Sequence, residues 1–264
     1  EMIYKNKIFK NASWIIGGRI GQSILSLIVT MLTARYLGPS NYGLISYVAS
    51  IVAFFSPIAQ LGLGNIQVQE IVSKPEEEGT IVGTSLLLSI IAAIACYIGV
   101  ISFVMVANAG ETDTLIVCAL YGVLLFFQGA ELIQYWFQAK YFSKFSSVVS
   151  LVAYFIVSIY KVFLLVTGKS IYWFAISNTL DYCIILVILI IVFKRIGRQH
   201  FIFSLKMAGQ LLEKSKYYIV ANLMVIVFTQ TDRVMLKLML DDASTGYYTA
   251  AITCAGLANF FFIA

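Results

Sequence analysis

Long apolar runs, separated by short polar stretches, dominate the chain from one end to the other. Eight of these runs have roughly the twenty residues that an α-helix needs to cross the hydrocarbon core of a bilayer. They lie near 13–34, 42–63, 80–107, 114–138, 146–167, 170–193, 217–240 and 246–264. The pattern therefore predicts an all-α polytopic membrane protein with about eight transmembrane helices.

The composition agrees with this pattern and excludes a soluble domain. Hydrophobic residues make up 60% of the 264 residues and charged residues 12%, and the mean hydropathy is +0.89. The sequence has no Walker motif or glycine-rich phosphate loop, so we expect no ATP hydrolysis in this chain. The cysteines stand singly, without the spacing of metal ligands, at Cys96, Cys118, Cys183 and Cys254. We therefore expect neither a metal site nor another cofactor.

Both ends of the sequence suggest boundaries within a longer chain. The last apolar run stops at Ala264 with no polar tail, and Glu1 precedes Met2. We expect a fragment for these reasons. The basic segment 5–10 precedes a full-length span rather than a short apolar core, so we expect no cleaved signal peptide.

Basic residues fall unevenly in the connections between the spans. The N-terminal segment and the connections 64–79, 139–145 and 194–216 hold twelve Lys and Arg residues, whereas the alternate connections hold three. Basic residues in short loops stay on the cytoplasmic side of a membrane. We therefore expect a cytoplasmic N-terminus. The formal net charge of +5 then reflects membrane topology, and we expect no nucleic-acid partner.

The connection 194–216 is the longest on the basic side and predicts a boundary between two bundles, although its basic and aromatic residues would also suit an anionic leaflet. A weak internal repeat supports the boundary. Segments 34–47 and 236–250 each place a basic residue before a polar turn, followed by Gly and Tyr at the next helix start. We predict an N-terminal cytoplasmic segment (1–12), a six-helix bundle (13–193), an inter-bundle loop (194–216) and the first two helices of a second bundle (217–264).

Ionisable side chains inside the apolar runs are the first candidates for function. At the centre of a bilayer such a side chain costs about 2.5–3.5 kcal/mol even on lenient insertion scales, so it usually faces protein, water or polar cargo. The six are Arg19, Glu131, Lys161, Asp181, Asp232 and Arg233. An alternative is that they neutralise one another between helices, for example Lys161 with Glu131 or Asp181.

Polar residues also recur at helical spacing within three of the spans. The sets are Arg19, Gln22, Ser26, Thr30 and Thr33 in the first span, Gln128, Glu131, Gln134 or Tyr135, and Gln138 in the fourth, and Asn222, Gln230, Arg233 and Lys237 in the seventh. Residues three or four positions apart share one face of a helix, so each set predicts one wall of a polar cavity. Asp232 lies about 100° around the helix from Arg233 and can have a different partner.

Several short segments, taken in order, resemble one known family. They are 11–19, 34–39, 42–43, 230–236 and 246–248. Together they resemble the bacterial polysaccharide-biosynthesis flippases, the O-antigen or Wzx-type translocases of lipid-linked oligosaccharides, which are a branch of the MATE-like (MOP) exporter superfamily. The resemblance implies a MATE-like two-bundle transporter in the bacterial inner (cytoplasmic) membrane. This chain would hold the first bundle and the start of the second.

The resemblance also implies a function. The protein would move an undecaprenyl-diphosphate-linked oligosaccharide, such as an O-antigen, capsule or exopolysaccharide repeat unit, from the inner to the outer leaflet by alternating access. Its partners would be this lipid-linked glycan, the lipid bilayer and other polysaccharide-assembly proteins.

The diphosphate of such a cargo is multiply anionic and needs fixed cations and hydrogen-bond donors where it leaves water. Arginine suits this role because its planar fork binds phosphate oxygens through paired hydrogen bonds. We therefore predict that Arg19, Lys161 and Arg233 contact the diphosphate. Further substrate contacts are expected from Gln22, Gln128, Gln134, Tyr135 and Gln230, and candidates for ion or proton coupling are Glu131, Asp181 and Asp232.

Other classes of function stay open. A MATE-like drug or cation antiporter would also use intramembrane carboxylates, although the three cations favour an anionic cargo. A peptidoglycan lipid-precursor flippase would need similar cations. A polymerase or ligase would be expected to carry a large outer loop with catalytic residues. The predicted outer loops near 35–41, 108–113, 168–169 and 241–245 are short, so we do not expect an enzyme.

Overall fold

The computed structural model describes the backbone of residues 2–196 and 201–263 and the side chains of residues 21–23, 25–195 and 201–256. In this part of the chain the regular structure is helical. The helices are α1 (Met2–Ala59), α2 (Leu63–Ser73), α3 (Glu78–Ala107), α4 (Thr112–Gly122), α5 (Leu124–Phe127), α6 (Gly129–Ala139), α7 (Ser143–Val166), α8 (Ile171–Ile196), α9 (Leu205–Met239) and α10 (Asp242–Ile263), with a short 3-10 helix η1 (Pro75–Glu77) before α3.

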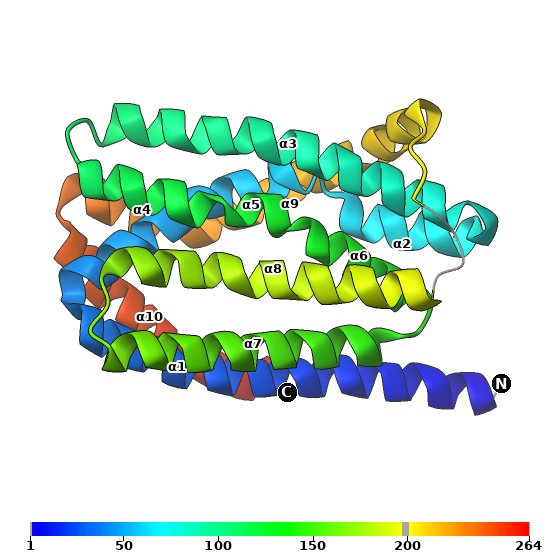
Figure 1. Ribbon diagram of the computed structural model, residues 1–264, viewed down its shortest axis with the longest axis horizontal. Helices are drawn as coiled ribbons and strands as arrows, with labels where there is room; N and C mark the ends of the chain where they lie inside the picture. The colour runs from blue at the N-terminus through cyan, green and yellow to red at the C-terminus, as the bar shows by residue number, and fades with distance from the viewer. Residues whose placement is uncertain (1, 197–200, 264) are drawn as a thin grey trace.

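Helix α1 contains two membrane-length legs. Gly38 has φ 72° and ψ 172°, which is not helical, and Pro39 follows it. Glycine adopts a positive φ without steric cost, and proline is well tolerated in the first turn of a new helix. Figure 1 shows that α1 runs from the N-terminus to the opposite end of the molecule and then turns back. The connection predicted over 35–41 is thus reduced to a sharp turn at Gly38.

Six helical stretches among the described residues are long and apolar enough to cross a membrane. They are Gly21–Ser73, Pro75–Ala107, Thr112–Ala139, Ser143–Val166, Ile171–Arg195 and Leu205–Met239. The first of them includes the second leg of α1 and part of the first, and α10 returns alongside α1 (Figure 1). Counting the two legs of α1 as separate helices and adding α10 to the other stretches gives about eight membrane-length helices, as the apolar runs predicted. The all-α polytopic fold is confirmed.

Two of the predicted spans are interrupted. The second leg of α1 ends at Ala59 and α2 begins at Leu63, and the fourth span is divided into α4, α5 and α6. The junctions in the fourth span lie at Val123, directly after Gly122, and at Gln128, which is buried. Broken helices are tolerated at membrane depth where the freed backbone faces protein or a cavity. The second junction places Glu131 in the first turn of α6.

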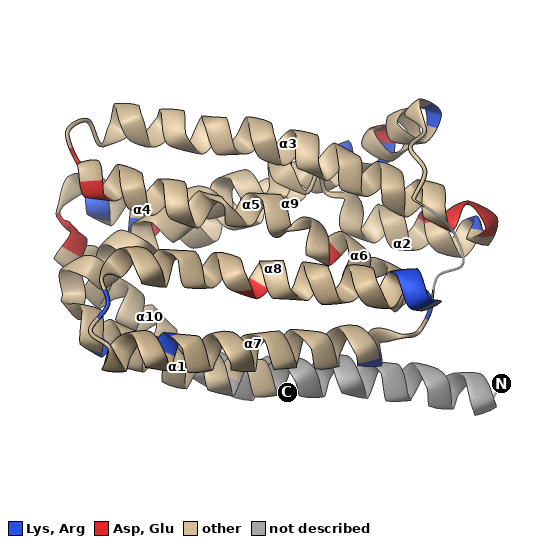
Figure 2. Ribbon diagram, viewed as in Figure 1, with Lys and Arg blue, Asp and Glu red and all other residues tan. Residues whose placement is uncertain are grey.

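The connections gather at the two ends of the helices (Figure 1). Those after α2, α6 and α8 lie at the end that holds the N-terminus, and those after α3, α7 and α9 lie at the opposite end. Figure 2 shows that the charged residues in the described part of the chain are concentrated at these ends, with few on the helices between them. Successive connections thus lie at opposite ends of the helices, as the comparison of basic residues between alternate connections assumes. The cytoplasmic N-terminus stays a prediction.

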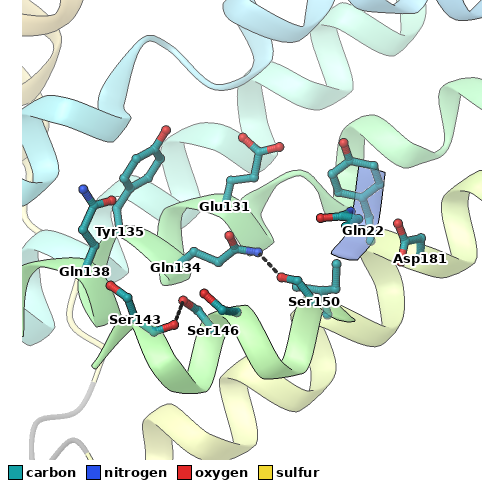
Figure 3. A pocket seen from close by; sticks show the side chains of 12 residues that line it. Gln22, Glu131, Gln134, Tyr135, Gln138, Ser143, Ser146, Ser150 and Asp181 are labelled. Carbon is teal, nitrogen blue, oxygen red and sulfur yellow. Dashed lines mark hydrogen bonds between the residues drawn. The ribbon is translucent and has the colours of Figure 1, made fainter. Parts of the chain in front are cut away.

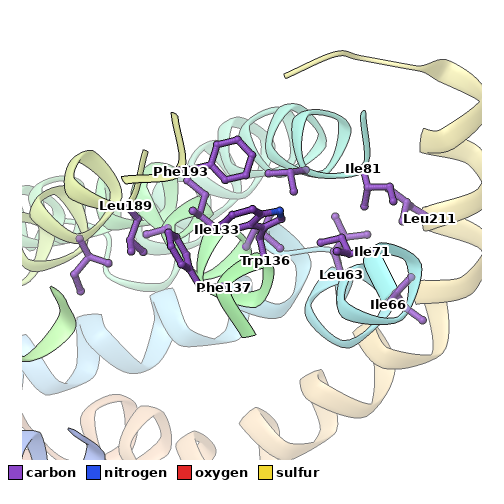
Figure 4. Packing of buried hydrophobic residues seen from close by; sticks show 14 of the residues in the cluster. Leu63, Ile66, Ile71, Ile81, Ile133, Trp136, Phe137, Leu189, Phe193 and Leu211 are labelled. Carbon is purple, nitrogen blue, oxygen red and sulfur yellow. The ribbon is translucent and has the colours of Figure 1, made fainter. Parts of the chain in front are cut away.

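Large aromatic side chains pack the core near the N-terminal end, where α2, α3, α6, α8 and α9 meet (Figure 4). Trp136 is 2% exposed, and its ring meets Phe137 and Phe193 edge-on at centroid distances of 4.9 and 4.7 Å. Its Nε1 donates to Glu78 at 3.4 Å, and Lys140 pairs with the same carboxyl at 2.6 Å. Edge-on aromatic pairs contribute about 0.5–1.5 kcal/mol beyond the area they bury. This cluster therefore fixes the rotation of α6, and with it the direction of its polar face.

Two glycines allow the closest approach between α1 and α10. A Cβ at Gly43 would lie 1.7 Å from the carbonyl oxygen of Asp242, and one at Gly246 would lie 2.0 Å from that of Pro39. Small residues let membrane helices pack backbone against backbone. Gly43 and Gly246 belong to the two segments of the predicted internal repeat, and they pack the start of the second leg of α1 against α10.

A network of charges lies near this contact between α1 and α10, at the end of the molecule opposite the N-terminus. Lys237 pairs with Glu111 at 3.1 Å and with Asp242 at 2.9 Å, and Glu111 also accepts a hydrogen bond from Thr114 at 2.7 Å. Burial alone would raise the pKa of the Glu111 carboxyl, but the hydrogen bonds from Thr114 and Lys237 outweigh it and hold that pKa below its usual range. The ionised form of Glu111 is therefore favoured in the folded protein.

We expect the Glu111 network to stabilise the fold at neutral pH and to lose this contribution in acid. Because the pKa is lower in the folded protein than in the unfolded chain, the contribution is complete above the unfolded pKa and is lost as pH falls through the folded pKa. Solvent screening keeps it small, since the Glu111 side chain is 44% exposed. The unfolding temperatures of wild type and Glu111→Gln should differ at neutral pH and converge in acid. A difference that widens in acid would contradict this prediction.

Candidate functional site

Polar side chains from α1, α6, α7 and α8 surround a cavity of about 350 Å³ (Figure 3). It is lined by Gln22, Glu131, Gln134, Tyr135, Gln138, Ser143, Ser146, Ser147, Ser150, Asp181, Tyr182 and Ile185. We call it the carboxylate cavity, because Glu131 and Asp181 are the charged residues among the described side chains that line it.

Helical spacing explains how two polar faces meet at this cavity. The residues on α6 are Glu131, Gln134, Tyr135 and Gln138, and those on α7 are Ser143, Ser146, Ser147 and Ser150, both sets at positions i, i+3, i+4 and i+7. The Nε2 of Gln134 donates to Ser150 Oγ at 3.3 Å and joins the two faces (Figure 3). The face on α6 was predicted from the sequence. The serine face on α7 was not, although its spacing carries the same signal.

Among the described side chains, no lysine or arginine forms a direct ion pair with either carboxylate of this cavity. Within the described part of the chain, no lysine or arginine lies within 4.0 Å of the carboxyl of Glu131 or Asp181. Glu131 lies beside the side-chain amide of Gln60, and Asp181 Oδ1 is buried without a hydrogen-bond partner. The direct ion pairs considered for Lys161, with Glu131 or with Asp181, do not form.

A second cavity, of about 250 Å³, lies among α1, α4, α7, α8, α9 and α10. Its lining residues are Val29, Thr30, Thr33, Tyr42, Ile45, Ser46, Ala49, Tyr121, Lys161, Phe174, Asn178, Arg233, Thr249 and Thr253. Both Lys161 and Arg233 line it, and no aspartate or glutamate does so among the residues whose side chains are described. We call it the cation cavity.

Hydrogen bonds orient both cations and leave donor groups available. Lys161 Nζ donates to Asn178 Oδ1 at 2.9 Å, and Arg233 Nη1 donates to Gln230 Oε1 at 2.8 Å. Arg233 Nε is buried without a hydrogen-bond partner. A buried charged donor that lacks a partner costs free energy. An anion that entered the cavity and accepted from this group would therefore be bound favourably.

Asp232 points away from Arg233, as adjacent positions on a helix require. Its carboxyl accepts from the hydroxyl of Tyr248 and from the backbone N–H of Arg233 at 2.8 Å, and it lines a separate, largely apolar hollow. The ion pairs between described side chains centre on Glu70, Glu78 and Lys237, near the helix ends. The guanidinium of Arg233 thus has no carboxylate partner among them.

A third hollow, of about 380 Å³, shares lining residues with both cavities. It shares Gln22 with the carboxylate cavity and Thr253 with the cation cavity. Helix α1 contributes Gln22, Ser26, Thr30 and Thr33 to the three spaces. From Gln22 to Thr33, the polar stripe predicted on the first span therefore lines these spaces.

The remaining predicted substrate contacts differ in their surroundings. The side chain of Arg19 lies outside the described residues. Gln128 is 5% exposed, donates to Ser56 Oγ at 2.9 Å and lines neither cavity. Gln230 Oε1 accepts from Arg233 and also from Ser50 Oγ at 3.0 Å. Gln230 therefore links α9 to α1 and orients the guanidinium.

Comparisons with known proteins bear on the family and the fold. A family model described as "Polysaccharide biosynthesis protein" matches residues 8–264, and a comparison with curated proteins gives no match. Among solved structures, the chain is similar to one described as the inward-facing conformation of a multidrug resistance MATE family transporter of the MOP superfamily, with a TM-score of 0.63 and 14% identity. The similarity covers 89% of this chain and 58% of that transporter.

The structural similarity shows the fold alone, because so few residues are identical, and this chain spans 58% of the transporter's length. The fold is MATE-like and polytopic, in agreement with the resemblance found in the sequence. The family match extends over nearly the whole sequence. The chain therefore belongs to the polysaccharide biosynthesis protein family.

Proposed function

We propose that this chain is part of a flippase for undecaprenyl-diphosphate-linked oligosaccharides. The cargo would move from the inner to the outer leaflet of the bacterial cytoplasmic membrane by alternating access. The family and the fold are those of MOP-superfamily flippases and transporters rather than of enzymes. The observation that supports this cargo is the cation cavity, in which Lys161 and Arg233 lie together without a lining carboxylate.

Two cations at membrane depth that form no direct ion pair with a described carboxylate favour an anionic occupant. Each costs about 2.5–3.5 kcal/mol on insertion scales unless water or an anion surrounds it. A diphosphate supplies several acceptor oxygens to the unpartnered Nε of Arg233 and to the ammonium of Lys161, and hydrogen bonds to charged groups contribute about 1.5–3 kcal/mol each. The diphosphate would therefore be held in the cation cavity.

The glycan would occupy the neighbouring polar space. The carboxylate cavity offers the side-chain amides of Gln22 and Gln134 and the hydroxyl of Tyr135, groups that can both donate to and accept from sugar hydroxyls. The third hollow joins it to the cation cavity through residues they share. The polyprenyl tail would stay in the hydrocarbon, so the cavity would need to bind only the polar end of the cargo.

A cation or drug antiporter is the second candidate, because Glu131 and Asp181 form no direct ion pair with any described lysine or arginine. The experiment that separates the two uses the complete protein in proteoliposomes. Movement of a fluorescent undecaprenyl-diphosphate oligosaccharide across the bilayer supports the flippase. Inactivity toward this lipid, together with exchange of organic cations in the same vesicles, supports the antiporter. Comparison with a peptidoglycan precursor lipid identifies which diphosphate-linked glycan is preferred.

Gln230 should act by positioning Arg233. In Gln230→Glu, a carboxylate would take the place of the amide oxygen that lies 2.8 Å from Arg233 Nη1, and it would neutralise the guanidinium. In Gln230→Met, the acceptor is removed but the charge of Arg233 is kept. We expect Gln230→Glu to lower the affinity for the diphosphate lipid about tenfold, because a negative charge beside the cavity weakens the binding of an anion. Gln230→Met should lower this affinity less. Equal effects of the two substitutions, measured by equilibrium binding, would contradict this role.

A further inference from the structure

We infer that the carboxylate cavity selects the glycan by charge, accepting neutral or amine-bearing sugars near the diphosphate and excluding acidic ones. This inference rests on the proposed function, because it concerns the part of the cargo that follows the diphosphate. It is carried by the lining of the two cavities. The protein gathers Lys161 and Arg233 in one and Glu131 and Asp181 in the other.

The hydrogen-bonding groups of the carboxylate cavity define what fits there. An ionised carboxylate accepts hydrogen bonds and donates none. Asp181 Oδ1 is buried and has no partner, and Glu131 lies beside a single amide, that of Gln60. The serines on α7 add hydroxyls along the opposite wall, and Ser143 and Ser146 are buried. An occupant that brings donors, such as sugar hydroxyls or an ammonium group, would satisfy these acceptors.

An acidic sugar would be repelled by the same carboxylates. Its carboxylate would be placed next to Glu131 and Asp181, and no lysine or arginine lines this cavity among the described residues. Like charges repel strongly where little water screens them. An uronic acid at this position would have to be protonated or held away from the wall. The cavity therefore works as a filter on glycan charge as well as a binding surface.

The position of the filter follows from the shared residues. The third hollow has Thr253 in common with the cation cavity and Gln22 in common with the carboxylate cavity. Cargo with its diphosphate beside Lys161 and Arg233 would extend past Gln22 toward the carboxylates. The sugars near the diphosphate are thus the ones whose charge is tested, and sugars farther along the glycan would be free to carry a negative charge.

The test is equilibrium binding to the complete protein in nanodiscs, with no ion gradient. Two short-chain polyprenyl-diphosphate sugars serve as probes, one carrying glucose and the other glucuronic acid. We expect wild type to bind the glucose lipid at least about tenfold more tightly, because juxtaposed like charges weaken binding. The double variant Glu131→Gln, Asp181→Asn should lose this preference by gaining affinity for the glucuronic acid lipid. Glu213→Gln, which neutralises an exposed carboxylate on α9, should keep it.

A second variant protects the test against misfolding of the double variant. Gln134→Glu adds a carboxylate to the same wall and should weaken binding of the glucuronic acid lipid more than it weakens binding of the glucose lipid. Equal binding of both lipids by wild type, with the requirement for diphosphate intact, would overturn the filter and leave the proposed function standing. Equal loss of both lipids in the double variant would also overturn it. Wild type that binds neither lipid would refute the proposed function itself.

Discussion

Replacing Arg233 by glutamine is expected to slow the transbilayer movement of a lipid-linked oligosaccharide about 100-fold. The substitution removes the charge that faces the cation cavity and the unpartnered Nε donor. Charge-assisted hydrogen bonds contribute about 1.5–3 kcal/mol each, and each 1.4 kcal/mol corresponds to about a factor of ten. Arg233→Lys should move the lipid at a rate between those of wild type and Arg233→Gln, because lysine keeps the charge and loses the planar fork. The measurement is lipid movement in proteoliposomes of the complete protein.

Stability separates this functional role from a structural one. An uncompensated buried charge destabilises the fold, so Arg233→Gln should unfold at the same temperature as wild type or higher while transport falls. Arg35→Gln is the matched control, because Arg35 is exposed on the first leg of α1, and it should keep wild-type transport. A large fall in both stability and transport for Arg233→Gln would indicate that the guanidinium holds the helices together instead.

Gly43→Ala is expected to destabilise the protein by at least about 3 kcal/mol, the upper part of the range for overpacked cores. The added methyl group would lie 1.7 Å from the carbonyl oxygen of Asp242, which is backbone and cannot rotate away. The start of the second leg of α1 and α10 would have to separate. We expect a lower unfolding temperature and impaired transport, since the end opposite the N-terminus could no longer close.

Gly209→Ala provides the matched control for Gly43→Ala. Gly209 lies in α9, and a Cβ there would have no heavy atom within 4 Å. Alanine is favoured over glycine inside a helix by about 1 kcal/mol, so this variant should be slightly stabilised. Opposite signs for the two substitutions would support the backbone contact. A Gly43→Ala protein as stable as wild type would show that α1 and α10 can separate there without cost.

The spans were predictable because bilayer thickness sets the length of an apolar helix. Their interruptions were less so. The break at Gly38 carried a signal, since proline follows it, and it shortened a predicted loop to a turn. The division of the fourth span at Gln128 carried a weaker signal, because only the glycine at position 129 marks it and Gln128 itself keeps helical dihedral angles.

Partners of the buried charges could not be read from the sequence. Helical spacing placed Arg233 on a polar face, but the rotation and neighbours of each helix decide which groups meet. Lys161 donates to Asn178 instead of pairing with a carboxylate, and Asp232 binds Tyr248 on the other side of α9 from the cation cavity. The separation of cations and carboxylates into two cavities is a property of packing that no single span displays.

The most direct test of the account is binding of a short-chain polyprenyl diphosphate to the complete protein, compared with the corresponding monophosphate and alcohol. The account predicts that wild type binds the diphosphate most tightly, then the monophosphate and then the alcohol, because each step removes charge from the cation cavity. The double variant Lys161→Gln, Arg233→Gln should bind all three alike. Wild type that binds the alcohol as tightly as the diphosphate, or a double variant that keeps the preference, would contradict the assignment of this cavity to the diphosphate.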